Sequence, residues 1–384
     1  MGKKLFRTHV RHPFGPFPPA RTPGHRDRGD MTEPPGAGTS RTSFLGEVKD
    51  AVSLRATLLV VGVVALQLLF IASYVGALHN PKPRDVAFGV VAPGVTAEQT
   101  AARLKQLPGS PLDPRTVPDA ASARKQILNR DIDGALVIDS RGIKDTLLVA
   151  TGGGTVLATT LETITTTLER AEQRTVRVVD VAPASSQDFD GLSSFYLVVG
   201  WCVGGYLCAS ILAISTGARP ANPRRAVIRL IVMALVAIVG GLGGAVIVGP
   251  ILGALPGSVM AFWGLGALIT FAVGAATLAL QGVFGVVGIG LAILLVVIAG
   301  NPSAGGAFPL PLLPPFWNAI GPALPPGAGT WVARSIAYFK GNAVTGPLLV
   351  LSAWALAGIL VTLLAATLRR KHEDLLDRPG AAGP

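Results

Sequence analysis

The chain is dominated by long apolar runs, separated by one long segment of mixed polarity and by short loops. Most runs reach the roughly 20 residues that an α-helix needs to cross a hydrocarbon core about 30 Å thick. The predicted membrane-spanning helices are Ala56–Leu78, Ser194–Ser215, Val227–Val248, Val259–Leu280, Val283–Ala299 and Pro347–Leu368. The fourth and fifth nearly touch, so we expect a tight turn or a broken hairpin at Gln281-Gly282. The pattern predicts a polytopic α-helical membrane protein with six transmembrane helices, grouped as 56–78, 193–299 and 347–368.

Residues 79–192, between the first two runs, have the pattern of an α/β domain large enough to form its own core. The expected strands are Asp85–Ala92, Asp133–Ile138, Asp145–Ala150 and Thr175–Val181. The expected helices are Thr96–Leu107 with Thr96 as cap, Asp119–Asn129 with Asp119 as cap, and a long helix after Gly152–Gly154. No Lys-Ser or Lys-Thr pair follows that glycine run, so we interpret it as a strand-to-helix turn and not as a phosphate loop.

The segments at the two ends differ from the apolar runs. Residues 1–42 are rich in Pro, Gly, Arg and Thr without an apolar period, which predicts a disordered basic tail. Residues 43–55 place Phe44 and Val48 on one apolar side, which is typical of an amphipathic helix at the membrane interface. That helix is either a platform for a cytoplasmic partner or a plain lead-in to the first span. Residues 369–384 form a second tail.

The loop at residues 300–346 is unusually hydrophobic. Its prolines predict a short helix at Phe316–Gly321, and a second helix is expected at Trp331–Phe339. In and just after that second helix, Trp331, Arg334, Tyr338 and Lys340 are at positions suited to contact lipid headgroups. The loop therefore predicts either two re-entrant helices that dip into the outer leaflet or an interfacial collar without function.

The formal net charge of +11 is concentrated at the ends of the apolar runs. A short loop holds Arg219, Arg224 and Arg225, whereas residues 79–192 balance thirteen basic against fourteen acidic residues. Because positive residues near span ends favour the cytoplasm, we expect both termini inside and residues 79–192 outside. The high content of Ala, Gly, Pro and Arg is typical of a GC-rich bacterium, so we expect the protein in a bacterial plasma membrane. Basic residues at membrane edges fit a lipid bilayer as partner and argue against nucleic acid.

The apolar runs carry little chemistry. Between Gly191 and Leu368 there is no Asp, Glu or His, the groups with which ion-coupled transporters bind their ions. This disfavours a secondary transporter and a membrane-embedded enzyme, and it predicts no catalytic, cofactor-binding or metal-binding residue. Cys202 and Cys208 point in different directions on one helix and cannot pair. A weakly polar path through such helices would suit an amphiphilic cargo better than an ion.

Small residues recur at a spacing of four in several runs, as at Gly200 and Gly204 and at Gly240 and Gly244. This spacing lets helices approach closely, because lipid supplies no hydrophobic drive for helix association. The pattern predicts close packing inside one helix bundle, or alternatively the seam of a homodimer.

A family resemblance appears in the sequence SAGGAFPLPLLPPFWNAIGPALPP, followed by WVARSIAYFKGN and a last span. It resembles the permeases of type-2 ATP-binding-cassette exporters, in the phage-infection-protein/YhgE-like branch. The matching residues are Ser303, Gly305, Gly306, Pro309, Leu313, Pro314, Phe316, Trp317, Leu324, Pro325 and Arg334. The segment VDVAPASSQDFDGLSSFYLVVGWCVGG is similar to the return of that family's external domain into the membrane. The resemblance covers roughly Arg55 to Arg370.

The resemblance implies the permease half of an exporter, working as a homodimer with a separate cytoplasmic ATPase. The residues then expected to couple to the ATPase are Phe44, Val48, Arg219, Arg224 and Arg225. The residues expected at an outer gate are Pro314, Phe316, Trp317 and Arg334. The loop Thr216–Ala226 is short for an ATPase dock, which keeps open a non-transporting envelope protein that presents residues 79–192 as a receptor or secretion-apparatus partner.

Overall fold

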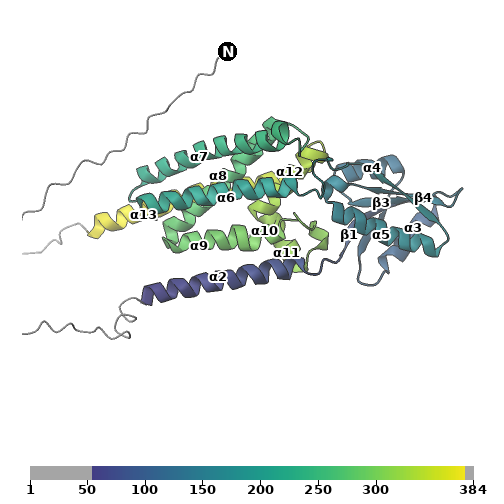
Figure 1. The fold of residues 1–384 in the computed structure, drawn as a ribbon, viewed down its shortest axis with the longest axis horizontal. Coiled ribbons are helices and arrows are strands. Elements are labelled where there is room, and N and C mark those ends of the chain that lie inside the picture. Colours follow the sequence, from purple (N-terminus) through teal and green to yellow (C-terminus); the bar gives the residue numbers. More distant parts are fainter. Residues whose placement is uncertain (1–53, 377–384) are drawn as a thin grey trace, which may run out of the picture. The chain divides into compact units, whose positions relative to one another are not determined.

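The computed structural model describes residues 54–376, which are mostly helical (Figure 1). The chain divides into two units, Met1–Thr57 and Leu58–Pro384. The second unit holds every described element after the first turn of α2 (Leu54–Leu78). The predicted tail at residues 1–42 and most of the predicted interfacial helix at residues 43–55, with Phe44 and Val48, lie outside the described residues. The last residues of the predicted C-terminal tail do so too.

Among the described residues, five helices are long and apolar enough to cross a membrane. They belong to α2 (Leu54–Leu78), α6 (Ser193–Thr216), α7 (Pro223–Val246), α8 (Val259–Phe284) and α13 (Thr345–Leu376). All five coincide with predicted runs, which confirms the expectation of a protein with multiple apolar helices of membrane-spanning length. The π-helical turn Ile247–Ile251, which contains Pro250, extends α7 by another turn.

The remaining predicted span forms a shorter apolar helix, Val287–Ser303. It consists of α9 (Val287–Ile293), the π-helical η3 (Leu294–Gly300) and α10 (Asn301–Ser303). The number of six spans therefore stays a prediction. The expected break at Gln281-Gly282 is wrong, because α8 continues to Phe284 and the chain turns at Gly285, with φ 65°. Glycine adopts this left-handed conformation without a Cβ penalty, which makes it a common helix stop.

The segment between α2 and α6 folds as the predicted α/β domain, with one additional strand. Its strands are β1 (Val86–Val91), β2 (Leu112–Thr116), β3 (Gly134–Val137), β4 (Lys144–Val149) and β5 (Thr175–Asp180). Its helices are α3 (Val95–Lys105), α4 (Ala120–Leu128), the 3₁₀ turn η1 (Thr151–Gly153) and α5 (Thr155–Ala171). The sheet order is β2-β1-β3-β4-β5, and only β3 and β4 pair antiparallel. The strand β2 was not predicted, because its sequence LDPRT contains a proline, which removes a backbone donor. Proline is tolerated at a sheet edge, and β2 is an edge strand.

Both faces of this sheet are buried, because successive side chains along a strand point to opposite faces. Val90 and Leu147 face the side covered by α3 and α5, and their neighbours Val91 and Leu148 face the side covered by α4. The predicted cap at Asp119 is confirmed, since its carboxylate accepts from the Ser122 amide at 2.7 Å. The predicted cap at Thr96 is wrong, since α3 already begins at Val95.

The hydrophobic loop at residues 300–346 folds into short helices. They are η4 (Leu310–Leu312), α11 (Pro315–Ile320), η5 (Gly321–Ala323) and α12 (Pro325–Tyr338). The expected start of the second helix at Trp331 is wrong by about two turns, because Pro325 and Pro326 occupy the first turn of α12, where a missing N–H carries no penalty. In Figure 1 the α/β domain gathers beside one end of the long helices, next to α12.

The glycines of α6 and α7 fall into two groups, and the tightly packed group was not the predicted one. A Cβ on Gly241 would lie 2.6 Å from Ala267 N, and one on Gly205 would lie 2.6 Å from Thr270 O. These two glycines hold α7 and α6 close against α8. Gly200, Gly204 and Gly240 have no atom within 4 Å of such a Cβ. The predicted pairs Gly200/Gly204 and Gly240/Gly244 therefore mostly face away from the tightest helix contacts, although Gly244 packs on Trp201.

Candidate functional site

The end of α4 is anchored to α12 by the side chain of Arg130. Its Nη1 donates to the Trp331 carbonyl and to the Ser335 hydroxyl, both at 2.9 Å. Its guanidinium carbon lies 3.4 Å from the centroid of the Trp331 ring and 4.8 Å from that of the Phe339 ring. Cation–π contacts of this kind are strongest when they are desolvated. Arg130 therefore connects the α/β domain to the loop that precedes α13.

The backbone of Arg130 has φ 63°, a left-handed conformation. A residue other than glycine in this region bears a cost of roughly 1–2 kcal/mol, and it persists where surrounding contacts fix it. Next to it the Asn342 amide donates to the Leu128 carbonyl at 3.0 Å, which satisfies one of the open carbonyls at the end of α4. The strained backbone places the guanidinium of Arg130 between its two aromatic partners.

Arg334 is the second cation of this region, and unlike the half-buried Arg130 it is buried, with 4% of its surface exposed. Its Nη1 donates to Gly305 O at 2.6 Å, and its Nη2 donates to Gly306 O at 2.8 Å and to Gly191 O at 3.3 Å. The expectation that Arg334 contacts headgroups is therefore wrong, because the surrounding loops enclose its guanidinium. Its Nε is buried and has no hydrogen-bond partner among the described residues.

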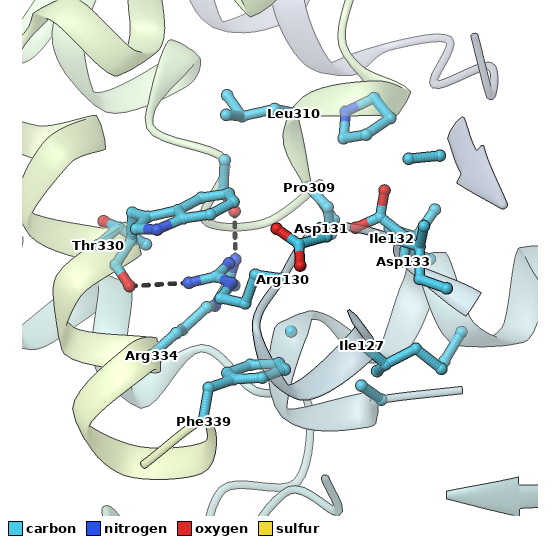
Figure 2. A pocket seen from close by; sticks show the side chains of 18 of the residues that line it. Ile127, Arg130, Asp131, Ile132, Asp133, Pro309, Leu310, Thr330, Arg334 and Phe339 are labelled. Atoms are coloured by element: carbon cyan, nitrogen blue, oxygen red, sulfur yellow. Dashed lines mark hydrogen bonds between the residues drawn. The ribbon is translucent and has the colours of Figure 1, made fainter. Parts of the chain in front are cut away.

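Arg130 and Arg334 line one cavity of about 190 Å³ between the α/β domain and the loop 304–339, which we call the junction pocket (Figure 2). Asp131 and Asp133 line it from the α/β domain. Neither arginine has a carboxylate within ion-pair distance in the part of the chain that the structure describes. The pocket is thus lined by two arginines and two aspartates that do not form ion pairs with one another.

Burial perturbs the charges of this pocket. It raises the pKa of Asp133 to about 6, against which the positive charge of Arg130 acts. Burial also lowers the pKa of Arg130 to about 9, and the neighbouring charge of Arg334 lowers it further. Both shifts have the direction that desolvation gives to a charged group. Between about pH 6 and 9 the pocket therefore carries the charges of both Arg130 and Asp133.

Glycine permits the close approach on which this pocket depends. A Cβ on Gly152 would lie 2.5 Å from the Tyr338 ring, and one on Gly154, with φ 142°, would lie 2.3 Å from Pro309. The strand-to-helix turn expected at the TGGGT run is confirmed as η1. The sequence analysis did not foresee that this turn packs closely against Tyr338 and Pro309. It also did not single out Arg130 or Asp133. The glycine run was the only sequence feature that pointed to this close contact, and it does not indicate which residues pack against it.

The loop between α6 and α7 holds the arginines predicted to couple to an ATPase. Buried Arg229 donates to the carbonyls of Thr216 at 3.2 Å and Gly217 at 2.6 Å, which satisfies the end of α6. Arg219 donates to Val283 O at 3.1 Å, at the end of α8. Arginine contacts thus fix the loop at both sides.

Arg224 and Arg225 are exposed in the first turn of α7, after the Asn222 cap. Cations are disfavoured at a helix N-terminus because the macrodipole is positive there. These two charges therefore do not serve the stability of α7 and remain available for contacts outside their own helix.

The predicted outer-gate residues do not form one cluster. Phe316 is 63% exposed on α11 and packs edge-on against Trp317, with ring centroids 5.0 Å apart. Pro314 precedes this helix and is half-buried. Of the predicted set only Arg334 lines the junction pocket.

A second cavity is a groove of about 480 Å³ between α6 and α7. Gly200, Gly204 and Gly240 line it, and Trp201 lies across it, donating from its indole nitrogen to Gly240 O at 3.2 Å. Thr270 also lines the groove. The groove is almost wholly apolar, and we call it the glycine groove.

Comparison of the chain with protein-family models, curated proteins and solved structures found no match.

Proposed function

We propose that this chain is the membrane subunit of an exporter that a separate cytoplasmic ATPase powers. The observation that carries the proposal is the fixed basic loop between α6 and α7. It presents Arg224 and Arg225 where they do not stabilise their own helix. Arg219 and Arg229 fix the loop to the ends of α8 and α6, so a movement of a bound ATPase would be transmitted to these helices.

The composition of the helices supports an external energy source. No carboxylate or imidazole occurs between Gly191 and Leu368, so these helices offer no group that binds and releases a coupling proton. The family resemblance at Ser303–Arg334 points to the same class. In this proposal six spans per chain, two copies of the chain and an external α/β domain form the complete permease in a bacterial plasma membrane.

The cargo in this proposal is hydrophobic or amphiphilic. The glycine groove supports it, since a cavity of about 480 Å³ lined almost only by carbon favours alkyl chains over hydrated ions. The conformational change of the ATPase would reach the helices through the basic loop and the segment with Phe44 and Val48. Phe316 and Trp317 would gate the opposite side of the membrane.

Charge reversal of the loop tests the proposal. The variant Arg224→Glu/Arg225→Glu should insert into the membrane but lose a nucleotide-binding subunit that co-purifies with the tagged wild-type chain. The variant Arg369→Glu/Lys371→Glu makes the same charge change at the end of α13 and should retain the subunit. If wild type recovers no such subunit, or if the loop variant still recovers it, this loop is not an ATPase dock.

The alternative is a non-transporting envelope protein that presents its α/β domain as a receptor or secretion-apparatus partner. The brevity of the loop favours it, since only residues 217–222 separate α6 from α7. The same purification distinguishes the two, because recovery of external partners alone would support the alternative.

A further inference from the structure

The junction pocket is lined by charges of opposite sign, and one of its two acids, Asp131, is also exposed to solvent. Arg334 Nε is buried without a partner, and Arg130 uses only Nη1 for its two hydrogen bonds among the described residues. Figure 2 shows the two arginines on the α12 side and Asp131 and Asp133 on the side of the α/β domain. Removing a guanidinium from water is expensive unless acceptors replace the water.

From this geometry we propose that the junction pocket binds a zwitterionic group, with its anion at Arg130 and Arg334 and its ammonium at Asp131 and Asp133. The cavity of about 190 Å³ has room for a group of a few heavy atoms, such as phosphoethanolamine. Arginine suits the anion because its planar fork matches phosphate and carboxylate oxygens. A carboxylate in turn accepts from an ammonium.

The unmatched donors argue for a ligand in place of a purely structural cluster. A structural pair would bring an arginine within 4 Å of a carboxylate, as Arg174 and Asp145 do elsewhere in the domain at 2.6 Å. Here the surrounding loops hold the arginines apart from the acids, since Arg334 is fixed by three carbonyls and Arg130 by Trp331 and Ser335. The cavity is therefore lined by charges of both signs that do not pair with each other, which would orient a dipolar ligand. The inference goes beyond the proposed function, because binding needs neither an ATPase nor transport.

The test is calorimetric titration of the purified full chain in detergent with phosphoethanolamine, inorganic phosphate and ethanolamine, without nucleotide. We expect phosphoethanolamine to bind about tenfold or more tightly than either fragment, because each fragment satisfies one charge pair only. Asp133→Asn should weaken phosphoethanolamine about tenfold and strengthen inorganic phosphate, since it removes a negative charge from the pocket. Arg130→Gln should weaken both.

Two controls carry matched changes outside the pocket. Asp190→Asn and Lys340→Gln alter exposed charges that do not line it, and they should leave every affinity unchanged. Asp133→Asn keeps the shape of the side chain, so it remains informative if Arg130→Gln fails to fold. Equal affinity for phosphate and phosphoethanolamine, no binding of either, or no effect of Asp133→Asn on phosphoethanolamine would overturn the proposal.

The zwitterion could be a lipid headgroup or a soluble metabolite. Nanodiscs of phosphatidylethanolamine and nanodiscs of phosphatidylglycerol separate these sources. If the headgroup reaches the pocket, phosphatidylethanolamine nanodiscs abolish titration by added phosphoethanolamine. If soluble molecules are the ligands, titration is the same in both.

Discussion

The hydroxyl of Tyr338 donates to Asp188 Oδ2 at 2.7 Å, although 150 residues separate the two in sequence. Asp188 is buried, and its other oxygen accepts from the Ser193 amide at 2.8 Å, at the first residue of α6. One carboxylate thus joins the end of α12 to the start of α6.

Tyr338→Phe should lower the stability of the chain by about 1.5–3 kcal/mol, the usual range for a hydrogen bond to a charged group. The buried carboxylate of Asp188 would lose one hydrogen-bond donor, and its burial keeps water from replacing it. Thermal unfolding of the detergent-purified protein measures the effect. Tyr196→Phe is the control, because Tyr196 is 63% exposed, and an equal shift in both variants would contradict the role of Asp188.

Arg334→Met should be more severe, by an estimated loss on the order of 3 kcal/mol or more. It would leave the carbonyls of Gly191, Gly305 and Gly306 without their donor in a buried site. Lys340→Met, at an exposed position, removes the same charge and should change the unfolding temperature little. Similar unfolding temperatures for the two variants would show that burial of Arg334 adds nothing to stability.

Gly241→Ala should destabilise the contact between α7 and α8 by about 1–3 kcal/mol, because overpacking forces the backbones apart. The new Cβ would lie 2.6 Å from Ala267 N and 2.9 Å from Trp263 O, and neither backbone atom can rotate away. Gly243→Ala, two residues along the same helix, meets no atom within 4 Å and should be neutral or slightly stabilising. Unfolding temperatures of the two variants test this contrast directly.

Glu169 should make the stability of the chain depend on pH. Burial raises its pKa from the ordinary 4.5 to about 7, as do the hydrogen bond and charge of Asp145, while Arg174 and Arg103 oppose the shift. A raised pKa means that the fold prefers protonated Glu169. This contribution to stability is complete below pH 4.5 and is lost as pH rises through about 7.

Glu169→Gln keeps the neutral form at every pH, so the fall in unfolding temperature between about pH 4.5 and 7 should become smaller. The lowered pKa of Asp145 acts below its ordinary 3.8 and so lies outside this window. Glu162→Gln, at an exposed position on α5, should leave the pH profile of wild type intact. An unchanged profile in Glu169→Gln would place the pH dependence elsewhere.

Much of the fold could be predicted from local pattern. The apolar runs at α6, α7, α8 and α13 have the length of membrane-spanning helices, and the near-continuous apolar segments at β1 and β4 fit strands that are buried on both faces. The cap at Asp119 could be predicted because its partner is three residues away. The strand β2 could not, because LDPRT has no strand signal and depends on pairing with β1.

The sequence by itself determined the apolar helices, the α/β domain and the basic residues at the helix ends, because each of these depends on neighbours along the chain. Only the tertiary structure decided that Arg334 is enclosed by Gly191, Gly305 and Gly306, and that Arg130 lies between Trp331 and Phe339. A basic residue on an amphipathic helix has the same sequence pattern whether it faces headgroups or a buried pocket. Its position depends on carbonyls and rings that can lie more than 200 residues away in sequence, as those around Arg130 do, and no local pattern encodes them.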